Sequence, residues 1–291
     1  MKAIVFGGSG LIGSALVSDF ERRGWETFAT STTGSGGRMI PFRLERDRFS
    51  ATPQLPTECD VAVICAGLAD IDTCKRDQGY SRSVNVTGTA CLVKELCERG
   101  VRPVFCSTDY VYSGEKGDYT EEDPTDPITV YGAQKVQIEE LVQRECPDGL
   151  VVRLSKVFTA DPGDRTLLSD WHRTIRSGRT IVCASDQVFC PTFLPDVVAG
   201  LVSLAEKRVS GLCHLCQPVK YSRASLLEEF AAHLGIQDYE VDIRPTEELG
   251  FLDRRGRDVS LVSRRFVAET GYSFTPMAEC FEALREALPS G

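Results

Sequence analysis

The sequence predicts an α/β protein with a doubly wound parallel sheet and a smaller C-terminal α/β lobe. Three observations support this prediction. Short apolar segments alternate with amphipathic ones through the first half of the chain. Several of these segments are apolar at nearly every position, which is typical of parallel strands that helices cover on both faces. The first apolar segment ends at a glycine-rich loop that opens a helix.

The expected elements follow from hydrophobic periodicity, taken in chain order. A strand at residues 2–6 leads into a helix that begins at Leu11 and ends at Gly24, because apolar residues recur there at helical spacing. Further strands are expected at residues 27–30, 61–66, 103–107 and 150–154, and further helices at residues 83–99 and 130–144. Beyond Lys156 the pattern loosens, and we expect helices at residues 167–177, 196–206, 226–234, 263–270 and 277–288, with a strand at residues 240–244.

Length, composition and charge limit the class of protein. The 291 residues suit one large or two closely joined domains, and 42% hydrophobic with 26% charged residues is near the average for globular proteins. A formal net charge of -9 disfavours nucleic acid and anionic membranes as partners. No apolar run approaches the roughly 20 residues of a membrane span, and no signal peptide precedes the first strand, so we expect a cytoplasmic protein.

The twelve cysteines are scattered through predicted strands and helices and do not bracket loops. We therefore expect reduced, buried thiols rather than disulfides, at Cys65, Cys91, Cys97, Cys106 and Cys183 among others. Cys213 and Cys216 have CxxC spacing, but strand alternation would point their thiols to opposite faces. No second pair has zinc spacing, so the sequence predicts no metal site.

The glycine-rich loop has GxxGxxG spacing through Gly7, Gly10 and Gly13. Glycines at these positions permit a tight turn, the approach of a pyrophosphate to bare backbone at a helix N-terminus, and close packing of the helix on the strand. A purely structural turn is the alternative. Because the loop follows a strand at the start of the chain and opens a helix, the pattern favours a dinucleotide site.

The end of the second strand indicates which dinucleotide is bound. Loops that prefer NAD carry an Asp or Glu there, whereas this chain has hydroxyl residues at positions 30–33. Ser31 and Thr32 could bond a 2′-phosphate, and Arg38 or Arg43 could pair with it. We therefore expect NADP(H), with NAD(H) less favoured, although Arg38 could equally lie on a solvated loop.

A tyrosine and a lysine four residues apart, Tyr131 and Lys135, share one face of a predicted helix. A phenol has a pKa of about 10, and a neighbouring ammonium favours its ionised form by charge proximity. Thr108, just past a central strand, could bond the same substrate oxygen. A buried tyrosine beside a lysine that reaches the surface is the alternative, but together with the glycine loop the three residues predict a catalytic site.

These motifs resemble the extended short-chain dehydrogenase/reductase family and, within it, the dTDP-4-dehydrorhamnose reductase group. The phrases that carry the resemblance are GGSGLIG at residues 7–13, VICAGLADID at 63–72, STDYVYSG at 107–114, YGAQK at 131–135, DQVFCPT at 186–192 and DVSLVSRRF at 258–266. They cover nearly the whole chain in the order of the family. The match is specific at the catalytic segment and weaker in the second lobe.

The resemblance implies a Rossmann-type fold and NADPH-dependent reduction of a keto group on a nucleotide-linked deoxysugar. In that scheme Tyr131 delivers the proton, Lys135 lowers the pKa of Tyr131 and binds the nicotinamide ribose, and Thr108 polarises the oxygen. Asn85 would match the structural and proton-relay asparagine of the family, or simply pack. Tyr110 replaces the glutamate with which related dehydratases abstract a proton.

The implied cofactor site gathers residues from several strand ends: Gly7, Ser9, Gly10, Leu11, Ile12, Ser31, Thr32, Arg38, Arg43, Leu44, Cys65, Ala66, Gly67, Ser107, Tyr131 and Lys135. Relatives often carry an aspartate where Arg43 stands, and the loop at residues 159–165 lacks the phrase typical of the rhamnose enzymes. Candidates for the substrate diphosphate, or ordinary surface charges, are Arg165, Arg254, Arg255 and Arg257.

The expected organisation is an NADP-binding Rossmann domain at residues 1–157, to which residues 180–214 contribute, and a substrate-binding lobe at residues 158–179 and 215–291. A cleft between them would hold the ligands. An epimerase of the same fold and a non-catalytic NADP-binding regulatory subunit, like that of methionine adenosyltransferase, are the alternatives to a reductase. The oligomeric state is open, a homodimer included.

Overall fold

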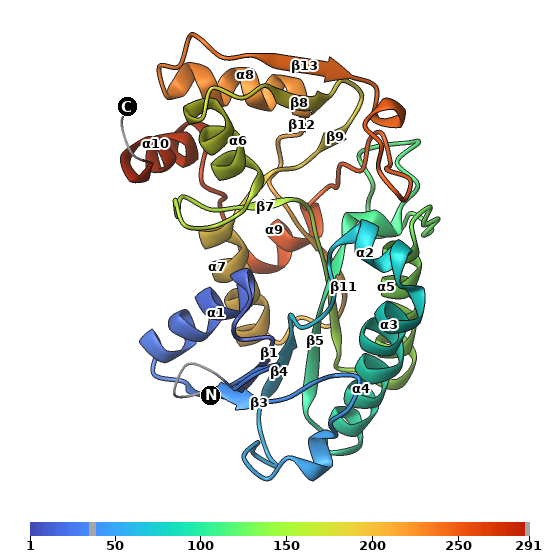
Figure 1. Cartoon of the computed structure of the whole chain (residues 1–291). Coiled ribbons are helices and arrows are strands. Elements are labelled where there is room, and N and C mark those ends of the chain that lie inside the picture. Colours follow the sequence, from blue (N-terminus) through green and yellow to red (C-terminus); the bar gives the residue numbers. More distant parts are fainter. Residues whose placement is uncertain (35–38, 289–291) are drawn as a thin grey trace.

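A seven-stranded parallel sheet forms the centre of the computed structural model, which describes residues 1–34 and 39–288 (Figure 1). From one edge to the other the strands are β11 (Gly211–Leu215), β6 (Leu150–Leu154), β5 (Arg102–Thr108), β4 (Val61–Ile64), β1 (Lys2–Phe6), β2 (Glu26–Ser31) and β3 (Met39–Pro41). Every neighbouring pair is parallel. The strand order reverses between β1 and β4, and in such sheets ligands bind beyond the carboxyl ends of the strands at this point.

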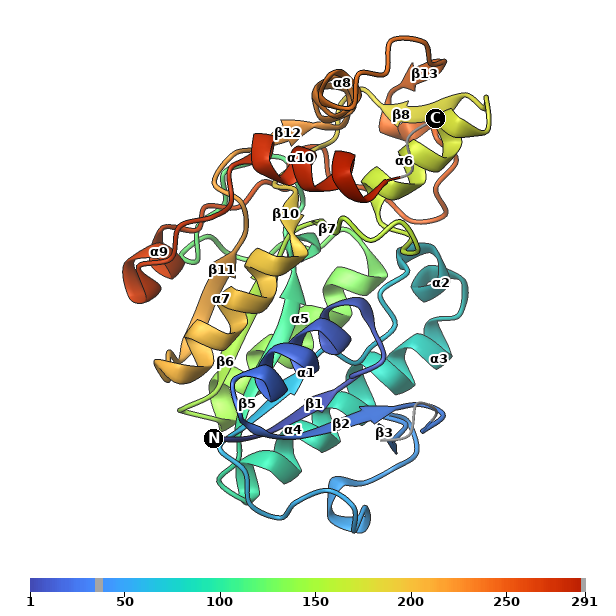
Figure 2. The same cartoon turned by 90° about the vertical axis from the view of Figure 1, so that its left-hand side faces the viewer.

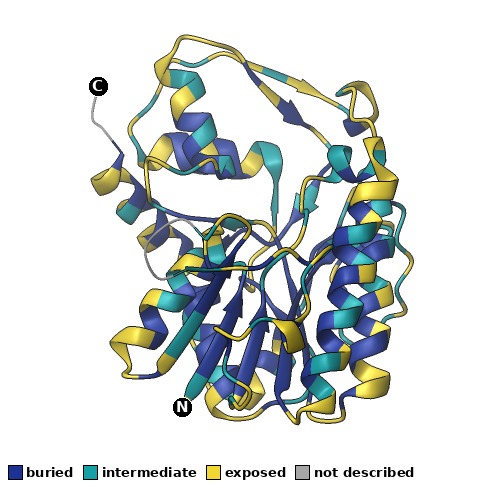
Figure 3. Cartoon of the chain, turned by 60° about the horizontal axis from the view of Figure 1, so that its bottom comes forward, coloured by how far each residue is buried: buried dark blue, intermediate teal, exposed yellow. Residues whose placement is uncertain are grey.

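Helices cover both faces of the sheet, which confirms the predicted fold class. On one face lie α1 (Leu11–Arg22) and α7 (Leu194–Glu206), side by side in Figure 2, and on the other lie α4 (Thr89–Glu98) and α5 (Val130–Glu145). Strand β1 serves both layers because its side chains alternate: Ala3 and Val5 belong to the first core, and Ile4 and Phe6 to the second. The central strands β1, β4, β5 and β6 are almost wholly buried, and the helices are exposed on their outer sides (Figure 3).

The connection from β4 to α4 is more elaborate than the single helix expected at residues 83–99. Two short helices, α2 (Ile71–Arg76) and α3 (Gln78–Arg82), come first, and the side chains of Asp70 and Asp77 cap them. A π-helical segment, η2 (Ser83–Gly88), then leads into α4. Such π segments often occur at functional sites, and this one carries Asn85.

A second lobe lies above the carboxyl ends of the strands (Figure 1). It contains α6 (Leu167–Arg176), α8 (Arg223–His233) and α10 (Met277–Ala287), together with the paired strands β8 (Ile181–Ala184) and β13 (Val241–Arg244), and β9 (Val188–Phe189) and β12 (Tyr221–Ser222). Its core includes Trp171, Phe230 and Phe281. The pair β7 (Val157–Phe158) and β10 (Thr192–Phe193) joins the lobe to the sheet, and α9 (Arg264–Thr270) returns to pack beside β11.

Three short 3-10 helices complete the described elements: η1 (Phe49–Ala51), η3 (Asp109–Val111) and η4 (Thr246–Glu248). Among residues 1–34 and 39–288, no helix combines the length and the apolar character needed to cross a membrane.

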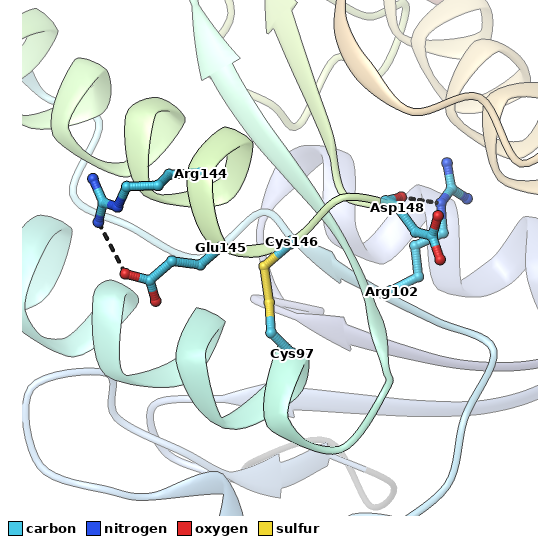
Figure 4. The surroundings of a disulfide bond; sticks show 6 residues. All are labelled: Cys97, Arg102, Arg144, Glu145, Cys146 and Asp148. Carbon is cyan, nitrogen blue, oxygen red and sulfur yellow. Dashed lines mark hydrogen bonds and ion pairs between the residues drawn. A yellow bond between two sulfur atoms is a disulfide. The ribbon is translucent and has the colours of Figure 1, made fainter.

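The cysteines correct one expectation. Cys97 and Cys146 form a disulfide with their Cα atoms 5.8 Å apart, so the expectation of a reduced thiol is wrong for Cys97 (Figure 4). Cys97 lies in the last turn of α4 and Cys146 directly follows α5, and these two helices pack together. The sequence separation of 49 between the two cysteines hides this proximity in the sequence.

The other ten cysteines are free thiols. Cys213 packs in the core beneath α7, whereas Cys216 belongs to a separate cluster beside Tyr112. In the described ranges, no three residues of metal-binding type are grouped so as to hold an ion.

Removing the disulfide by Cys146→Ser should lower the free energy of unfolding by about 2–4 kcal/mol, because the bond constrains the unfolded chain over a long loop. Denaturant titration with and without a reductant measures this difference. Wild-type protein should lose a similar amount of stability in reductant, and a Cys97→Ser/Cys146→Ser variant should not respond to it. Equal wild-type stability in both conditions would contradict the assigned bond.

Candidate active site

The first turn of α5 carries Tyr131 and is fixed on both sides. The Thr129 side chain accepts a hydrogen bond from the Gly132 N–H at 2.8 Å, and the Val130 N–H donates to Asp253 Oδ2 at 2.8 Å. A Cβ at position 132 would lie 2.0 Å from the Tyr110 carbonyl oxygen, so a glycine is needed for this close approach. The turn is therefore pressed against the segment that follows β5.

Thr108 is the last residue of β5 and directly precedes the segment against which α5 packs. Its hydroxyl donates to Asp109 Oδ1 at 3.0 Å and accepts from the Tyr110 N–H at 3.2 Å. The other oxygen of Asp109 accepts from Ser155 Oγ at 2.8 Å. Both Thr108 and Asp109 are buried, so a carboxyl group held by two hydroxyls lies directly behind the predicted catalytic threonine.

Tyr131 is buried, and its phenol is held in the protonated form. Burial raises the pKa of Tyr131, and the nearby Asp109 carboxylate raises it further, whereas a hydrogen bond with Thr108 acts in the opposite direction. At neutral pH the phenol therefore carries a proton that it can donate. A lowering of this pKa by Lys135 is not among the main influences here, and that role stays a prediction.

Lys135 lies one turn further along α5 and is buried as well. Its Nζ donates to the Cys106 carbonyl oxygen at 2.9 Å and lies 5.7 Å from the centre of the Tyr131 ring. Burial lowers the pKa of Lys135, while the neighbouring thiols of Cys106 and Cys65 and the carboxylate of Glu139 raise it. The ammonium thus lies between the carboxyl ends of the central strands and the phenol.

The glycine loop closes tightly on the start of α1. The Gly7 N–H donates to Thr30 Oγ1 at 3.3 Å, and a Cβ at Gly13 would lie 2.2 Å from the Gly7 carbonyl oxygen. No side chain caps the first turn of α1, so its backbone N–H groups remain available to a ligand. Ser9, Gly10 and Leu11 are exposed at this end of the helix.

The predicted residues at the end of β2 form a separate group. Ser31 Oγ accepts from the Gly34 N–H at 2.9 Å, and Arg43 Nε donates to the Thr32 carbonyl oxygen at 3.2 Å. Arg43 therefore lies beside Thr32, as binding of a 2′-phosphate would require. Arg38 lies outside the described residues. Leu44 is buried in the core next to α4, and Ala66 packs against the same core.

One cleft of about 510 Å³ brings the glycine loop and the catalytic residues together. Of the predicted site residues, it is lined by Gly10, Leu11, Ile12, Cys65, Gly67, Ser107, Thr108, Tyr131 and Lys135. The remaining predicted cofactor residues among the described ones, which are Gly7, Ser9, Ser31, Thr32, Arg43, Leu44 and Ala66, do not line it.

Asn85 in η2 holds the loop that follows β4. Its Oδ1 accepts from the Leu68 N–H at 2.8 Å, and its Nδ2 donates to the Leu68 carbonyl at 2.9 Å and to Gln134 Oε1 at 2.8 Å. Leu68 lines the cleft, so Asn85 positions part of its wall. A proton relay through Asn85 stays a prediction.

The end of the cleft under the second lobe is cationic, and the sequence analysis missed most of it. Lys156, Arg165 and Arg223 line it together with Gln187 and Phe189. Burial lowers the pKa of Lys156, and the charge of Arg223 lowers it further. Cations that repel one another in a shared cleft favour an anionic ligand.

Position along the chain explains which of these cations could have been predicted. Lys156 follows the carboxyl end of β6, where binding residues of parallel sheets are expected, so topology could have indicated it. Arg223 begins α8, and no local pattern marks it.

Of the four predicted arginines, only Arg165 lines this cleft. Arg254, Arg255 and Arg257 line a neighbouring cavity of about 340 Å³. Arg255 pairs with Asp72 at 2.9 Å and Arg257 with Asp186 at 3.4 Å, so two of these three charges already have carboxylate partners.

Comparison with known proteins identifies the family. The profile of a family described as RmlD substrate binding domain matches residues 1–288. The chain belongs to this family. This match confirms the resemblance to the dTDP-4-dehydrorhamnose reductase group that the sequence motifs indicated.

Individual members of the RmlD family match along most of their length. The dTDP-4-dehydrorhamnose reductase of Mycobacterium tuberculosis is 27% identical over 99% of this chain and 92% of that protein. The probable low-salt glycan biosynthesis reductase Agl14 of Haloferax volcanii is 28% identical over 81% of each protein. A solved dTDP-4-dehydrorhamnose reductase from Bacillus anthracis, in complex with NADP, has the same fold with a TM-score of 0.85, 19% identity and 98% coverage of both chains.

The buried carboxyl group of Asp109 makes stability depend on pH. Burial raises its pKa from 3.8 to about 6, although hydrogen bonds from Ser155 and Thr108 lower it in part. The folded protein thus keeps this proton to a higher pH than the unfolded chain, so the free energy of unfolding should fall as pH rises from about 4 to about 6.

Asp109→Asn should remove this dependence. Relative to wild type, the variant should gain about 2 kcal/mol of stability between about pH 4.5 and about pH 7.5. Denaturant unfolding at the two pH values measures the change. A difference between variant and wild type that does not vary with pH would show that Asp109 is ionised in the folded protein throughout.

Proposed function

We propose that this protein reduces a keto group on a nucleotide-linked deoxysugar with NADPH. The observation that carries the proposal is the cleft of about 510 Å³, in which the start of α1 and the set Thr108, Tyr131 and Lys135 face the same space. The likeness to dTDP-4-dehydrorhamnose reductases supports the same reaction class. The sugar would be a 4-keto-6-deoxy sugar or a close relative.

The residues present fit an NADP cofactor. The uncapped first turn of α1 offers backbone N–H groups to a pyrophosphate, and the close packing of Gly13 on Gly7 brings this turn near the strand ends. Arg43 beside Thr32 would bind the 2′-phosphate, and Arg38 is a further candidate. When bound, NADPH supplies the hydride for the carbonyl carbon.

Residues of the protein would supply the proton that the carbonyl oxygen takes up. Tyr131, protonated at neutral pH, would donate to the carbonyl oxygen, and the Thr108 hydroxyl would orient that oxygen. Once the proton has left, the hydrogen bond with Thr108 would favour the phenolate. The charge of Lys135, 5.7 Å from the ring centre, is predicted to act in the same direction. Lys135 would also bond the nicotinamide ribose. Tyr110 stands where related dehydratases carry a glutamate, and burial raises its pKa to about 12, which disfavours a role as a base.

The cationic end of the cleft would bind the substrate diphosphate through Lys156, Arg165 and Arg223. The substrate lobe would comprise residues 158–179 and 215–291 of the sequence prediction, with two changes: β8 and β9 join it, and α9 leaves it because it packs beside β11. Of residues 180–214, the part from β10 onward joins the NADP-binding half, because β8 and β9 pair with strands of the lobe. A cytoplasmic location and a homodimer remain parts of the proposal.

Tyr131→Phe should reduce kcat by about 10²–10⁴-fold, because it removes the proton donor and leaves the ring in place. NADPH affinity should stay within about twofold of wild type, since no pyrophosphate contact changes. Steady-state kinetics with a 4-keto sugar nucleotide and direct NADPH titration provide the two measurements. Tyr80→Phe, on the exposed side of α3, is the matched control. Wild-type turnover in the Tyr131 variant would exclude the phenol as the acid.

Arg223→Met should raise KM for the sugar nucleotide by about 10–100-fold and change kcat much less, because a charged hydrogen bond to the diphosphate is lost. The corresponding change at the exposed Arg176, outside the cleft, should leave KM unchanged. If both variants behave alike, the diphosphate binds elsewhere.

Cofactor stoichiometry separates the proposal from its two alternatives. A reductase consumes one NADPH for each sugar reduced, whereas an epimerase leaves NADPH unchanged over many turnovers. A regulatory subunit would bind NADPH without turnover of any keto sugar nucleotide and would co-purify with another enzyme.

A further inference from the structure

Two free thiols, Cys65 and Cys106, lie in contact in the wall of the cleft, and the proposed reaction uses neither. Their sulfur atoms are 3.6 Å apart. Both residues line the cleft. Cys106 is buried in β5, and Cys65 directly follows β4 and is partly exposed. From the sequence both were expected to be reduced, buried thiols, and Cys65 was in addition expected to contact the cofactor.

The strand register brings the two cysteines to a spacing that a disulfide can span. Strands β4 and β5 are parallel neighbours in which Ile64 pairs with Phe105, so Cys65 and Cys106 are the next residues in register. Neighbouring strands lie about 4.8 Å apart, within the range of about 4.4–6.8 Å that Cα atoms of disulfides span. Closing the gap between the sulfur atoms from 3.6 Å to about 2.05 Å requires side-chain rotation and only small shifts of the strands.

The surroundings favour a reactive thiolate at Cys106. The Nζ of Lys135 donates to the Cys106 carbonyl at 2.9 Å, which places an ammonium beside the backbone of this residue. The hydrogen bond from Cys65, together with the charge of Lys135, lowers the pKa of Cys106. A thiolate next to a cation and a second thiol is the arrangement found in cysteine pairs that react with oxidants.

We propose that Cys65 and Cys106 form a redox-active pair that hydrogen peroxide converts into a disulfide, and that the oxidised cleft binds NADPH more weakly. The Cys106 thiolate attacks peroxide: an S–O bond forms, the O–O bond breaks, and hydroxide leaves and takes up a proton. The Cys65 thiol then attacks the sulfenic sulfur, so that an S–S bond forms and the second oxygen leaves as water. Two thiols lose two electrons and two protons, and one peroxide becomes two waters.

The weaker binding of NADPH follows from the position of the two cysteines next to the cleft wall and Lys135. This part of the proposal rests on the proposed function. Cys65 precedes the loop at residues 66–70 that forms part of the cleft wall, and the Cys106 carbonyl holds Lys135. Formation of the disulfide would shift the start of the loop at residues 66–70 and the Cys106 carbonyl that holds Lys135. A bound cofactor would in turn cover Cys65 and slow the oxidation.

Peptide mapping of the whole protein after peroxide treatment tests the bond itself. Tryptic peptide 100–116 contains Cys106 as its one cysteine, and peptide 49–75 contains Cys65 together with Cys59 and Cys74. We expect these two peptides to be linked in wild type and in the control Cys91→Ser, and unlinked in Cys65→Ser. Should Cys65→Ser fail to fold, fragmentation of the linked wild-type peptides assigns the bond. Unlinked wild-type peptides, whether the thiols stay reduced or are oxidised separately, would overturn the proposal.

Titration with NADPH tests the consequence. Oxidised wild type should bind NADPH at least about tenfold more weakly than reduced wild type, whereas Cys106→Ser should show an oxidised-to-reduced ratio near one. Equal affinity of the two wild-type forms would overturn the coupling to the cofactor. A reduced protein that does not bind NADPH at all would refute the proposed function instead, and the peptide map would still decide whether the disulfide forms.

Discussion

The packing of the first turn of α5 against the segment after β5 is the constraint on which the site depends. At Gly132 the helix lies so close to the Tyr110 carbonyl that a methyl group would not fit between them. Because of this contact, Tyr131 and Lys135 face Thr108 at the carboxyl end of a central strand. The same edge of the sheet receives the start of α1, so a parallel sheet and one close helix contact are enough to assemble the proposed site.

Around this site one buried arginine is paired with a carboxylate, whereas other cations have no such ion pair among the described residues. Beneath Ser107, Glu139 and Arg153 form a buried ion pair at 2.6 Å, and the Ser107 hydroxyl donates to the same carboxylate. Lys135 has a carbonyl oxygen as its hydrogen-bond partner, and Lys156 and Arg223 repel each other at the far end of the cleft. A dinucleotide and a sugar diphosphate would bring negative charge to both places. Neighbouring cations of this kind repel one another in the free protein and contribute to the affinity for an anionic ligand.

The sequence was most informative where one local signal determines the structure. Strands β1 and β6 were predicted at both ends, because they are buried on both faces and every position is constrained. The glycine loop and the Tyr131–Lys135 pair were predicted because each depends on spacing within one element. Strand β3 and the lobe strands β8, β9 and β12 are two to four residues long, too short to show a period, whereas β13 was predicted to within one residue.

Features that depend on distant segments could not be predicted. To predict the Cys97–Cys146 disulfide, one must know that α4 and α5 end side by side. To predict that Arg223 lines the cleft, one must know that the second lobe folds over the sheet. The raised pKa of Tyr131 likewise arises from burial and from Asp109, which adjoins Thr108 in sequence but acts through space. Spacing alone suggested that Lys135 would lower this pKa.

The central claim is that hydride from NADPH reaches a keto carbon in the cleft while the chain supplies the proton. The most direct measurement is the mass of the product formed from a 4-keto sugar nucleotide with NADPH that carries deuterium at the transferable position of the nicotinamide. Our account predicts one deuterium at the reduced carbon for each NADPH oxidised. A product without deuterium, or a sugar that is altered while the cofactor stays reduced, would contradict it.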